Sequence, residues 1–307
     1  MKIIHFIKNV KVVQNLIKLV LSVILILFLV QHLSINSIYL AVKNANKLLI
    51  FCAFALLPLN IYLQFLRWRL LCLTVEKSSN TTILKSIFLG IAAGLITPLK
   101  AGEFIGRASI FDFNKLKTYT SLSVYDRIIS MLVTFVFGIV FGIFTVPPIF
   151  NVFFNYLIPL SIFVFIFLFS LFLLIRFKIF NFLNKIANFF INLFLSINFY
   201  NNIKLILLAV FFFLTYVFQF ALLLAAFNGL GSIFNFISAG ILVFFTNTII
   251  PPITLGELGI REGAAVYYAN YFNYIASTGF SSSIILFSIN IIIPSIIGLF
   301  FYMKEKS

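Results

Sequence analysis

Long apolar runs set the strongest limit on what this chain can fold into. Residues 17–30 and 158–175 are near or at the length that a helix needs to cross a bilayer. Hydrophobic residues make up 63% of the sequence and charged residues 9%, which excludes a soluble domain. The runs are continuous, whereas the strands of a membrane β-barrel alternate between apolar and polar residues. The sequence therefore predicts an all-α, polytopic membrane bundle.

Six stretches are long and apolar enough to be full spans: residues 16–33, 48–73, 121–146, 156–175, 205–227 and 284–303. The first has no small-residue cleavage site, so we expect an uncleaved anchor rather than a signal peptide. Residues 1–15 are predicted to be a cytoplasmic lead-in, and residues 176–204 a cytoplasmic surface linker between two halves. We treat residues 1–307 as a single transmembrane domain.

Two further segments are apolar but are interrupted by the same polar pattern. Residues 98–107 read PLKAGEFIGR and residues 252–261 read PITLGELGIR, so both carry Pro-x-x-x-Gly-Glu-x-x-x-Arg. The apolar stretch before the first pattern, residues 83–97, is short for a crossing. Non-helical backbone at membrane depth is tolerated only where protein or a water-filled cavity surrounds it. We therefore predict two re-entrant segments, each a helix that enters, breaks and returns.

The residue types in the pattern suit such a break. Proline ends a helix and glycine permits a tight turn, so we assign structural roles in the two loops to Pro98, Gly102, Pro252, Gly256 and Gly259. The glutamate then falls in the first helical turn, where exposed N–H groups favour an anion. The arginine follows four residues later on the same face. Glu103–Arg107 and Glu257–Arg261 are thus candidate ion pairs.

These charges have two interpretations, which the sequence leaves open. The pairs are either structural staples that close the loops or part of a translocation path. On the second interpretation Lys100, Arg107 and Arg261 hold a phosphate, because a guanidinium presents a two-pronged donor. Asp126 and Glu262 then handle a cationic group or a proton. Asp126-Arg127, near the start of the third span, has the alternative of pairing with a re-entrant loop.

The triplet Arg67-Trp68-Arg69 ends the second span and also has two interpretations. Tryptophan and arginine commonly anchor a helix at headgroup depth on the cytoplasmic side. Alternatively, the arginines recruit an anionic headgroup.

The basic residues predict orientation rather than nucleic-acid binding. The net charge of +15 comes from lysines and arginines in short loops, which we place on the cytoplasmic side together with both termini. Three full spans separate the two breaks, so the re-entrant loops enter from opposite faces, as in an inverted repeat. Cys52 and Cys72 are interpreted as small apolar fillers. We expect no metal site and no cofactor.

Four motifs in order carry a resemblance to a known family: RWRLL at residues 67–71, TPLKAGEFIGR at 97–107, YDRIIS at 125–130 and LGELGIREGAA at 255–265. Together they resemble the flippase-like transmembrane domain of lysylphosphatidylglycerol synthases and its stand-alone relatives. The resemblance covers nearly the whole chain. It implies an inner-membrane protein in which the family's characteristic positions are Pro98, Gly102, Glu103, Arg107, Arg127, Gly259 and Glu262. At Glu257 the family more often has glycine, which weakens the symmetry between the loops.

The expected function is movement of a phosphate-bearing or aminoacylated lipid between leaflets of the plasma membrane. Bifunctional members of the family carry a soluble domain that transfers the aminoacyl group, whereas this sequence ends four residues after Met303, so we expect no enzymatic activity. The alternatives are a membrane enzyme acting on a headgroup, an ion-coupled importer of a small solute, and an accessory subunit without transport activity. Substitution of Glu103 or Arg107 by glutamine is expected to impair function without preventing membrane insertion.

Overall fold

A computed structural model describes residues 35–97, 100–147, 197–228, 231–250 and 259–306. Within these ranges every regular element is a helix, which confirms the all-α prediction. Four helical stretches are long and apolar enough to cross a membrane: Lys47–Cys72, Phe113–Thr145, Phe199–Asn228 and Ala276–Met303. They correspond to the second, third, fifth and last predicted spans. The predicted lead-in, the first and fourth spans and most of the surface linker lie outside the described residues.

The span boundaries differ in detail from the predictions. The second span is two helices, α3 (Lys47–Ala55) and α4 (Leu57–Cys72), because Pro58 in the first turn of α4 has no N–H to continue the preceding helix. The helix α11 (Phe199–Asn228) begins within the predicted linker. The last span begins earlier than predicted, with α14 (Ala276–Phe287), passes through a π-helical turn, η3 (Ser288–Ile292), and ends with α15 (Ile293–Lys306).

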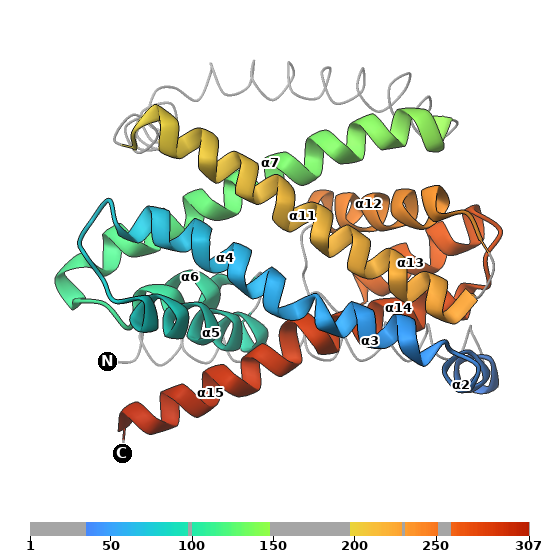
Figure 1. Cartoon of the computed structure of the whole chain (residues 1–307), viewed down its shortest axis with the longest axis horizontal. Coiled ribbons are helices and arrows are strands. Elements are labelled where there is room, and N and C mark those ends of the chain that lie inside the picture. Colours follow the sequence, from blue (N-terminus) through green and yellow to red (C-terminus); the bar gives the residue numbers. More distant parts are fainter. Residues whose placement is uncertain (1–34, 98–99, 148–196, 229–230, 251–258, 307) are drawn as a thin grey trace, which may run out of the picture.

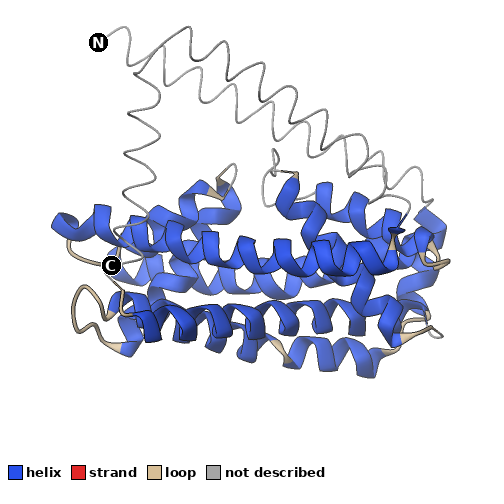
Figure 2. Cartoon of the chain, turned by 90° about the horizontal axis from the view of Figure 1, so that it is seen from above, coloured by secondary structure: helices blue, strands red, loops and turns tan. Residues whose placement is uncertain are grey.

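Two helical hairpins form in the interrupted segments. The first pairs α5 (Asn80–Ile96) with α6 (Ala101–Ala108), and the second pairs α12 (Ile233–Ile249) with α13 (Ile260–Tyr271). They lie in opposite halves of the molecule, α5 and α6 at one end and α12 and α13 at the other (Figure 1). The α3–α4 stretch and the long helices α7 (Leu116–Thr145) and α11 run between the two ends (Figure 1). Figure 2 shows the bundle from above, with helices and loops but no strand in the described part of the chain. The hairpins thus lie at opposite ends of the described bundle, and their entry from opposite faces of a membrane stays a prediction.

Side chains at the turn hold the first hairpin closed. Ser79 Oγ accepts a hydrogen bond from the Thr82 N–H and starts α5. At the other end of α5, Thr97 Oγ1 donates to the Ala93 carbonyl at 2.8 Å and accepts from the Gly102 N–H at 2.7 Å. Lys100 precedes α6 with a left-handed backbone (φ 54°), which is uncommon for a residue with a side chain. Pro98 lies outside the described residues.

Gly102 lets the two arms of this hairpin approach closely. A Cβ at this position would lie 2.4 Å from the Ala93 carbonyl oxygen, so Gly102→Ala must push α6 away from α5. We expect the variant to lose about 1–3 kcal/mol of stability, the usual cost of overpacking. Thermal denaturation of the purified protein in detergent measures this loss. Gly263→Ala in α13 is the control, because its Cβ would meet open space. Equal melting temperatures for both variants would contradict the assigned close contact.

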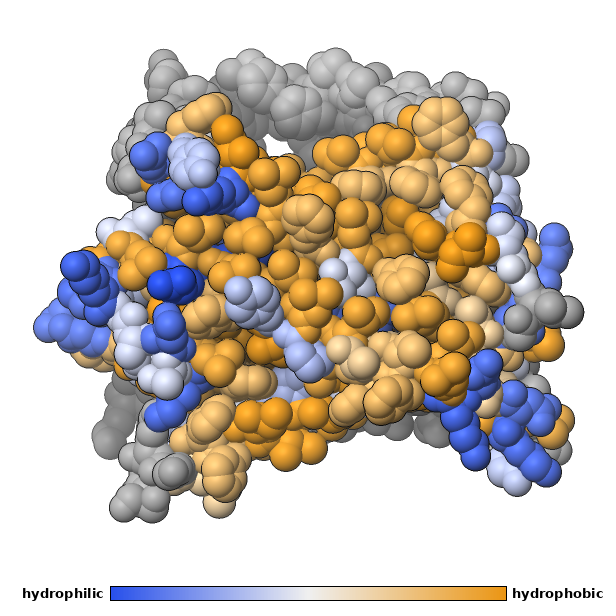
Figure 3. All heavy atoms as spheres, in the orientation of Figure 1, coloured by the Kyte–Doolittle hydropathy of each residue, from blue (hydrophilic) through white to orange (hydrophobic). Residues whose placement is uncertain are grey.

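The surface separates into two polar ends and an apolar middle. Figure 3 shows hydrophilic residues at the left and right edges and a hydrophobic band between them. The left end, where the α4–α5 and α6–α7 connections lie, carries Lys77, Lys115 and Lys117. The right end, near α2 (Ile35–Lys43), carries Lys43 and Lys47. Exposed apolar side chains in the band suit a helix bundle surrounded by lipid.

Candidate functional site

A cavity of about 180 Å³ lies in the interior, between the first hairpin and the long helices. Side chains from α4, α5, α6, α7, α11, α12 and η3 line it, so it touches both halves of the fold. Its charged lining residues are basic Arg67, Lys100, Arg107 and Arg127 and acidic Glu103 and Asp126. The lining therefore carries a formal surplus of two positive charges.

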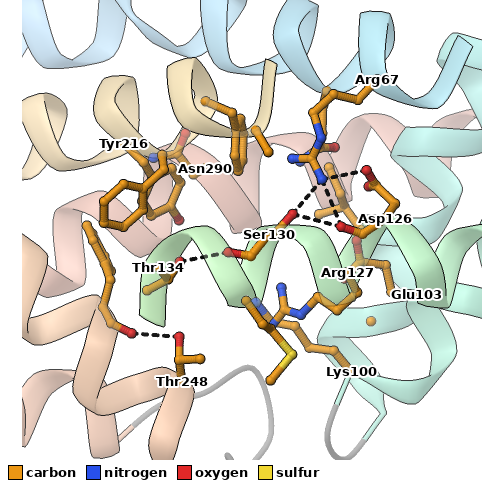
Figure 4. A pocket seen from close by; sticks show the side chains of 18 of the residues that line it. Arg67, Lys100, Glu103, Asp126, Arg127, Ser130, Thr134, Tyr216, Thr248 and Asn290 are labelled. Atoms are coloured by element: carbon orange, nitrogen blue, oxygen red, sulfur yellow. Dashed lines mark hydrogen bonds and ion pairs between the residues drawn. The ribbon is translucent and has the colours of Figure 1, made fainter. Parts of the chain in front are cut away.

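Asp126 on α7 is the centre of the charged side of the cavity. Arg67 Nη2 donates to Asp126 Oδ1 at 2.5 Å and to the Asp126 carbonyl oxygen at 3.0 Å. Arg107 Nη1 on α6 donates to the other carboxylate oxygen, Oδ2, at 3.2 Å. One carboxylate thus joins two guanidinium groups from different helices, and all three residues are at most 4% exposed. Figure 4 shows Arg67, Asp126 and Ser130 facing one another.

Each arginine has additional support. Arg107 Nη2 donates to Glu103 Oε1 at 2.7 Å, which is the pair that the four-residue spacing predicts. The Arg107 guanidinium lies 5.6 Å from the Trp68 ring centroid, and that of Arg67 lies 5.5 Å from the Phe212 ring centroid. Both are within range of a cation–π attraction. The packed rings fix the direction of both guanidinium groups.

The buried polar atoms of cavity-lining residues that have no hydrogen-bond partner among the described residues include Gln64 Oε1, Arg67 Nε and Arg107 Nε. Leaving a buried donor unsatisfied costs about 1–3 kcal/mol, and more when the group is charged. A ligand with acceptor oxygens in the cavity would satisfy the two Nε donors. The two arginines are therefore suited to bind an anion.

The opposite side of the cavity is neutral. It is formed by the aromatic side chains of Phe213, Tyr216 and Phe244 together with Asn247, Thr248 and Asn290. Figure 4 shows Tyr216 and Asn290 on this side, away from Arg67 and Glu103. Asn290 lies in η3, a π-helical turn, and such turns are frequent at functional sites. The cavity thus offers a cationic side and a neutral polar and aromatic side.

Three buried amides connect the neutral side to the helix bundle. Gln219 Oε1 accepts from Asn60 Nδ2 at 2.8 Å and from Asn290 Nδ2 at 2.7 Å, and Asn60 Nδ2 also donates to Asn290 Oδ1 at 3.1 Å. Gln219 Nε2 donates to the Ala53 carbonyl, next to the break between α3 and α4. These contacts join α4, α11 and η3, and apart from Asn60 Oδ1 they satisfy amide groups that would be costly in an apolar bundle.

The second hairpin contains a separate charged cluster that does not line the cavity. Arg261 Nη2 donates to Glu262 Oε1 at 2.6 Å, and Arg261 Nε donates to Ser283 Oγ at 2.9 Å. Glu262 Oε2 accepts from the Gly259 N–H at 2.6 Å and so caps α13, where Gly259 has a positive φ of 96° that favours glycine. Arg261 is 1% exposed and Glu262 is fully buried. This cluster is sealed by protein.

The equivalent arginines of the two hairpins therefore have different surroundings. Each arginine contacts the helix that follows its own. Arg107 of α6 donates to Asp126 of α7, and Arg261 of α13 donates to Ser283 of α14. Only Arg107 lines the cavity. The predicted partner Glu257, together with Pro252 and Gly256, lies outside the described residues, so a Glu257–Arg261 pair stays a prediction.

The interface interpretation of the triplet at residues 67–69 is wrong for two of its three members. Arg67 is 1% exposed and points into the cavity, and Trp68 is fully buried, with its Nε1–H donating to Ser86 Oγ at 2.7 Å. A residue at headgroup depth would face lipid instead. Arg69 alone is exposed, because it lies on the outer face of α4. The rotation of α4 about its axis directs residues 67 and 68 into the bundle, and the sequence of the triplet alone does not reveal that rotation.

A polar contact joins the α4–α5 connection to the start of α7 at the basic end of the molecule. Glu76, in the α4–α5 connection, accepts hydrogen bonds from the Lys115 ammonium and, at 2.9 Å, from the Tyr119 hydroxyl. The Lys115 hydrogen bond holds the pKa of the Glu76 carboxyl below its usual value, with a smaller contribution from Tyr119. Tyr119 stacks on Phe111 with ring centroids 3.9 Å apart. The contact ties the start of α7, and hence Asp126, to the end of α4.

Several cavity residues were missed in the sequence, among them Gln64, Ser130, Thr134, Tyr216, Asn247, Thr248 and Asn290. A signal for some of them was present, because an amide in an apolar span is rare and usually faces the bundle interior. Lys100, Glu103, Arg107, Asp126 and Arg127 are predicted site residues that the fold brings together around one cavity. Arg261 and Glu262 are not part of it.

The fold and the site define a class: a multi-pass helical membrane protein with two opposed hairpins and a charged interior cavity. The chain belongs to the family described as lysylphosphatidylglycerol synthase TM region, whose model matches residues 15–298. This confirms the family resemblance. Comparisons with curated proteins and with solved structures found no match.

Proposed function

We propose that this protein moves a phosphate-bearing or aminoacylated lipid between the leaflets of the plasma membrane. The observation that supports the proposal best is the cavity whose charged lining includes buried Arg67 and Arg107, each with an unsatisfied Nε among the described residues. Arginine is the preferred ligand for phosphate because its planar fork matches two phosphate oxygens. The family name connects this type of membrane region with synthesis of an aminoacylated lipid.

The position of the cavity favours transport. In proteins with inverted repeats the substrate site lies near the midplane, between broken helices that approach from opposite sides. Here the cavity lies beside the first hairpin and reaches α12 of the second. A phosphate held by the arginines would leave the rest of the headgroup beside Tyr216 and Asn290. Rocking of one half against the other would then expose the cavity to each leaflet in turn.

The distribution of lysines supports an orientation. The end that carries Lys77, Lys115 and Lys117 has more basic residues than the end with Lys43 and Lys47, and the more basic side of a membrane protein is commonly cytoplasmic. Since α15 ends at the same end as the α4–α5 connection, we place the C-terminus in the cytoplasm (Figure 1). We propose the same side for the N-terminus. No catalytic role is assigned to any residue.

Leaflet-resolved labelling in proteoliposomes tests the translocase proposal. Purified protein is reconstituted with fluorescent phosphatidylglycerol, lysylphosphatidylglycerol or a polyprenyl phosphate, and a membrane-impermeant reductant bleaches the outer leaflet. Accelerated loss of the protected fraction, compared with empty vesicles, is the expected result for at least one lipid. No acceleration for any of them would refute the proposal.

Glu103→Gln and Arg107→Gln are expected to slow translocation while the protein still inserts and folds. Without Arg107, Asp126 keeps Arg67 as its partner, and Glu103 retains some exposure to solvent. The two carboxylates that remain are therefore not isolated in the interior. Size-exclusion profiles in detergent report the fold, and the labelling assay reports the rate. Wild-type rates in both variants would show that this pair is a structural staple only.

One observation favours a second function, import of a small anion. The cavity volume of about 180 Å³ suits a group the size of a phosphate or a compact headgroup. Uptake of radioactive inorganic phosphate into proteoliposomes, with and without a proton gradient, distinguishes the two. Gradient-dependent uptake without lipid movement would favour the importer.

A further inference from the structure

A second cavity, an apolar groove, lies on the outer side of α4. It is bounded by α4, α5 and the start of α15 and has a volume of about 510 Å³. Its walls are mainly aliphatic and aromatic side chains, among them Ile61, Phe65, Leu84 and Phe88. None of its lining residues also lines the charged cavity. The groove is therefore a separate site that the proposed translocation path does not use.

The backbone keeps this groove open. Pro58 and Pro294 line it, and each lies in the first turn of its helix, after a break in the regular hydrogen-bond pattern. On the opposite wall, α15 packs tightly on α5, because a Cβ at Gly298 would lie 2.2 Å from the Phe88 carbonyl oxygen. The space between α4 and α15 thus follows from helix geometry and not from one side-chain rotamer.

The groove opens onto the surface that faces lipid. Tyr62 on its rim is 54% exposed, and the neighbouring Leu59 and Ile296 are 42% and 61% exposed. Along α5 the groove extends from Asn80 to Phe88, which at about 1.5 Å per residue is about 12 Å. Half of a hydrocarbon core of about 30 Å is a similar depth. The length of the groove therefore suits an acyl chain from one leaflet.

One end of the groove is polar and basic. Asn80 and Thr81 line it where α5 begins, and Lys77 is exposed just before them. Lys85 lies one turn further along α5, with its ammonium 5.9 Å from the Phe301 ring centroid. These lysines lie at the more basic end of the molecule, so the charge there complements an anionic headgroup.

We propose that the groove binds one acyl chain of an anionic phospholipid that remains with the protein. Its headgroup lies near the start of α5, and its chain extends along Leu84 and Phe88 toward Pro58 and Pro294. This lipid wedges between α4 and α15 and is not the lipid that enters the charged cavity. The proposal requires only that the bundle spans a membrane and does not depend on translocation.

Lipid retention tests the proposal. The full chain is reconstituted in nanodiscs of phosphatidylglycerol, extracted in mild detergent and examined by native mass spectrometry. Wild type is expected to retain one more phosphatidylglycerol per chain than Leu84→Trp, whose indole fills the groove. Leu132→Trp, an exposed position on α7, is the control and should retain as much as wild type. Equal retention in all three proteins overturns the proposal.

A photo-crosslinking amino acid at Tyr62 provides a measurement that does not depend on how Leu84→Trp folds. Irradiation in the same nanodiscs is expected to give an adduct with the mass of phosphatidylglycerol. A crosslink to another segment of this chain, such as residues 17–30, or to a second copy shows that protein fills the groove and overturns the proposal.

Discussion

Glu262→Gln is expected to destabilise the protein by about 3–5 kcal/mol, the usual cost of breaking a buried ion pair from one side. Both Glu262 oxygens accept hydrogen bonds, Oε1 from Arg261 and Ser283 and Oε2 from the Gly259 N–H. A glutamine side chain has only one acceptor oxygen, so its NH₂ group would face one of the donors that now bind a Glu262 oxygen. It also removes the carboxylate to which Arg261 Nη2 donates, and Arg261 is only 1% exposed. The expected readout is aggregated protein or a strongly lowered melting temperature in detergent.

Two comparisons separate this effect from a general sensitivity to substitution. Glu103→Gln makes the same chemical change in the first hairpin, but Glu103 is partly exposed, so its loss of stability should be much smaller. Arg261→Met/Glu262→Gln removes both charges and should be more stable than Glu262→Gln alone. If Glu262→Gln melts like wild type and only translocation changes, the cluster belongs to the transport path and not to the scaffold.

Arg67→Gln is expected to give the largest loss of translocation among variants that fold. Arg67 faces the cavity and has a free Nε among the described residues, whereas Asp126 keeps Arg107 as a partner when Arg67 is removed. A hydrogen bond to a charged group contributes about 1.5–3 kcal/mol, so the rate should fall about ten- to a hundredfold if the contact is strongest in the transition state. Initial rates in the proteoliposome assay measure the effect.

The chain supplies a matched control for this variant. Arg69→Gln removes the same charge two residues away on the same helix, but Arg69 is exposed and does not line the cavity. It should leave the rate unchanged. Arg67→Lys should be intermediate, because an ammonium keeps the charge but loses the two-pronged geometry. Similar losses in Arg67→Gln and Arg69→Gln would show that general surface charge, rather than the cavity, controls the rate.

Together these variants assign different roles to the two hairpins. The first hairpin has its arginine beside a cavity with excess positive charge, and the second has its arginine enclosed and neutralised by an adjacent glutamate. A similar sequence pattern thus gives a charged cluster that lines the cavity in one half (the open cluster) and a charged cluster enclosed by protein in the other half (the closed cluster). We infer that the closed cluster stabilises the fold and that the open one is available to a ligand.

The sequence by itself determined the features that depend on local chemistry. Continuous apolar runs require spanning helices, and the Pro-x-x-x-Gly-Glu-x-x-x-Arg pattern breaks a helix whatever surrounds it. The Glu103–Arg107 contact follows from helical spacing within α6. Counting the predicted spans between the hairpins also predicts that they enter from opposite faces of the membrane.

Only the tertiary structure decided which charges meet. Arg67 and Asp126 are 59 positions apart, and Asn60, Gln219 and Asn290 come from three separate elements. Such contacts depend on how each helix is rotated about its axis and on where neighbouring helices cross. A run of Arg-Trp-Arg reads the same whether its first two members face lipid or the interior. Packing turned Arg67 and Trp68 inward and closed protein around Glu262, and no local pattern contains that information.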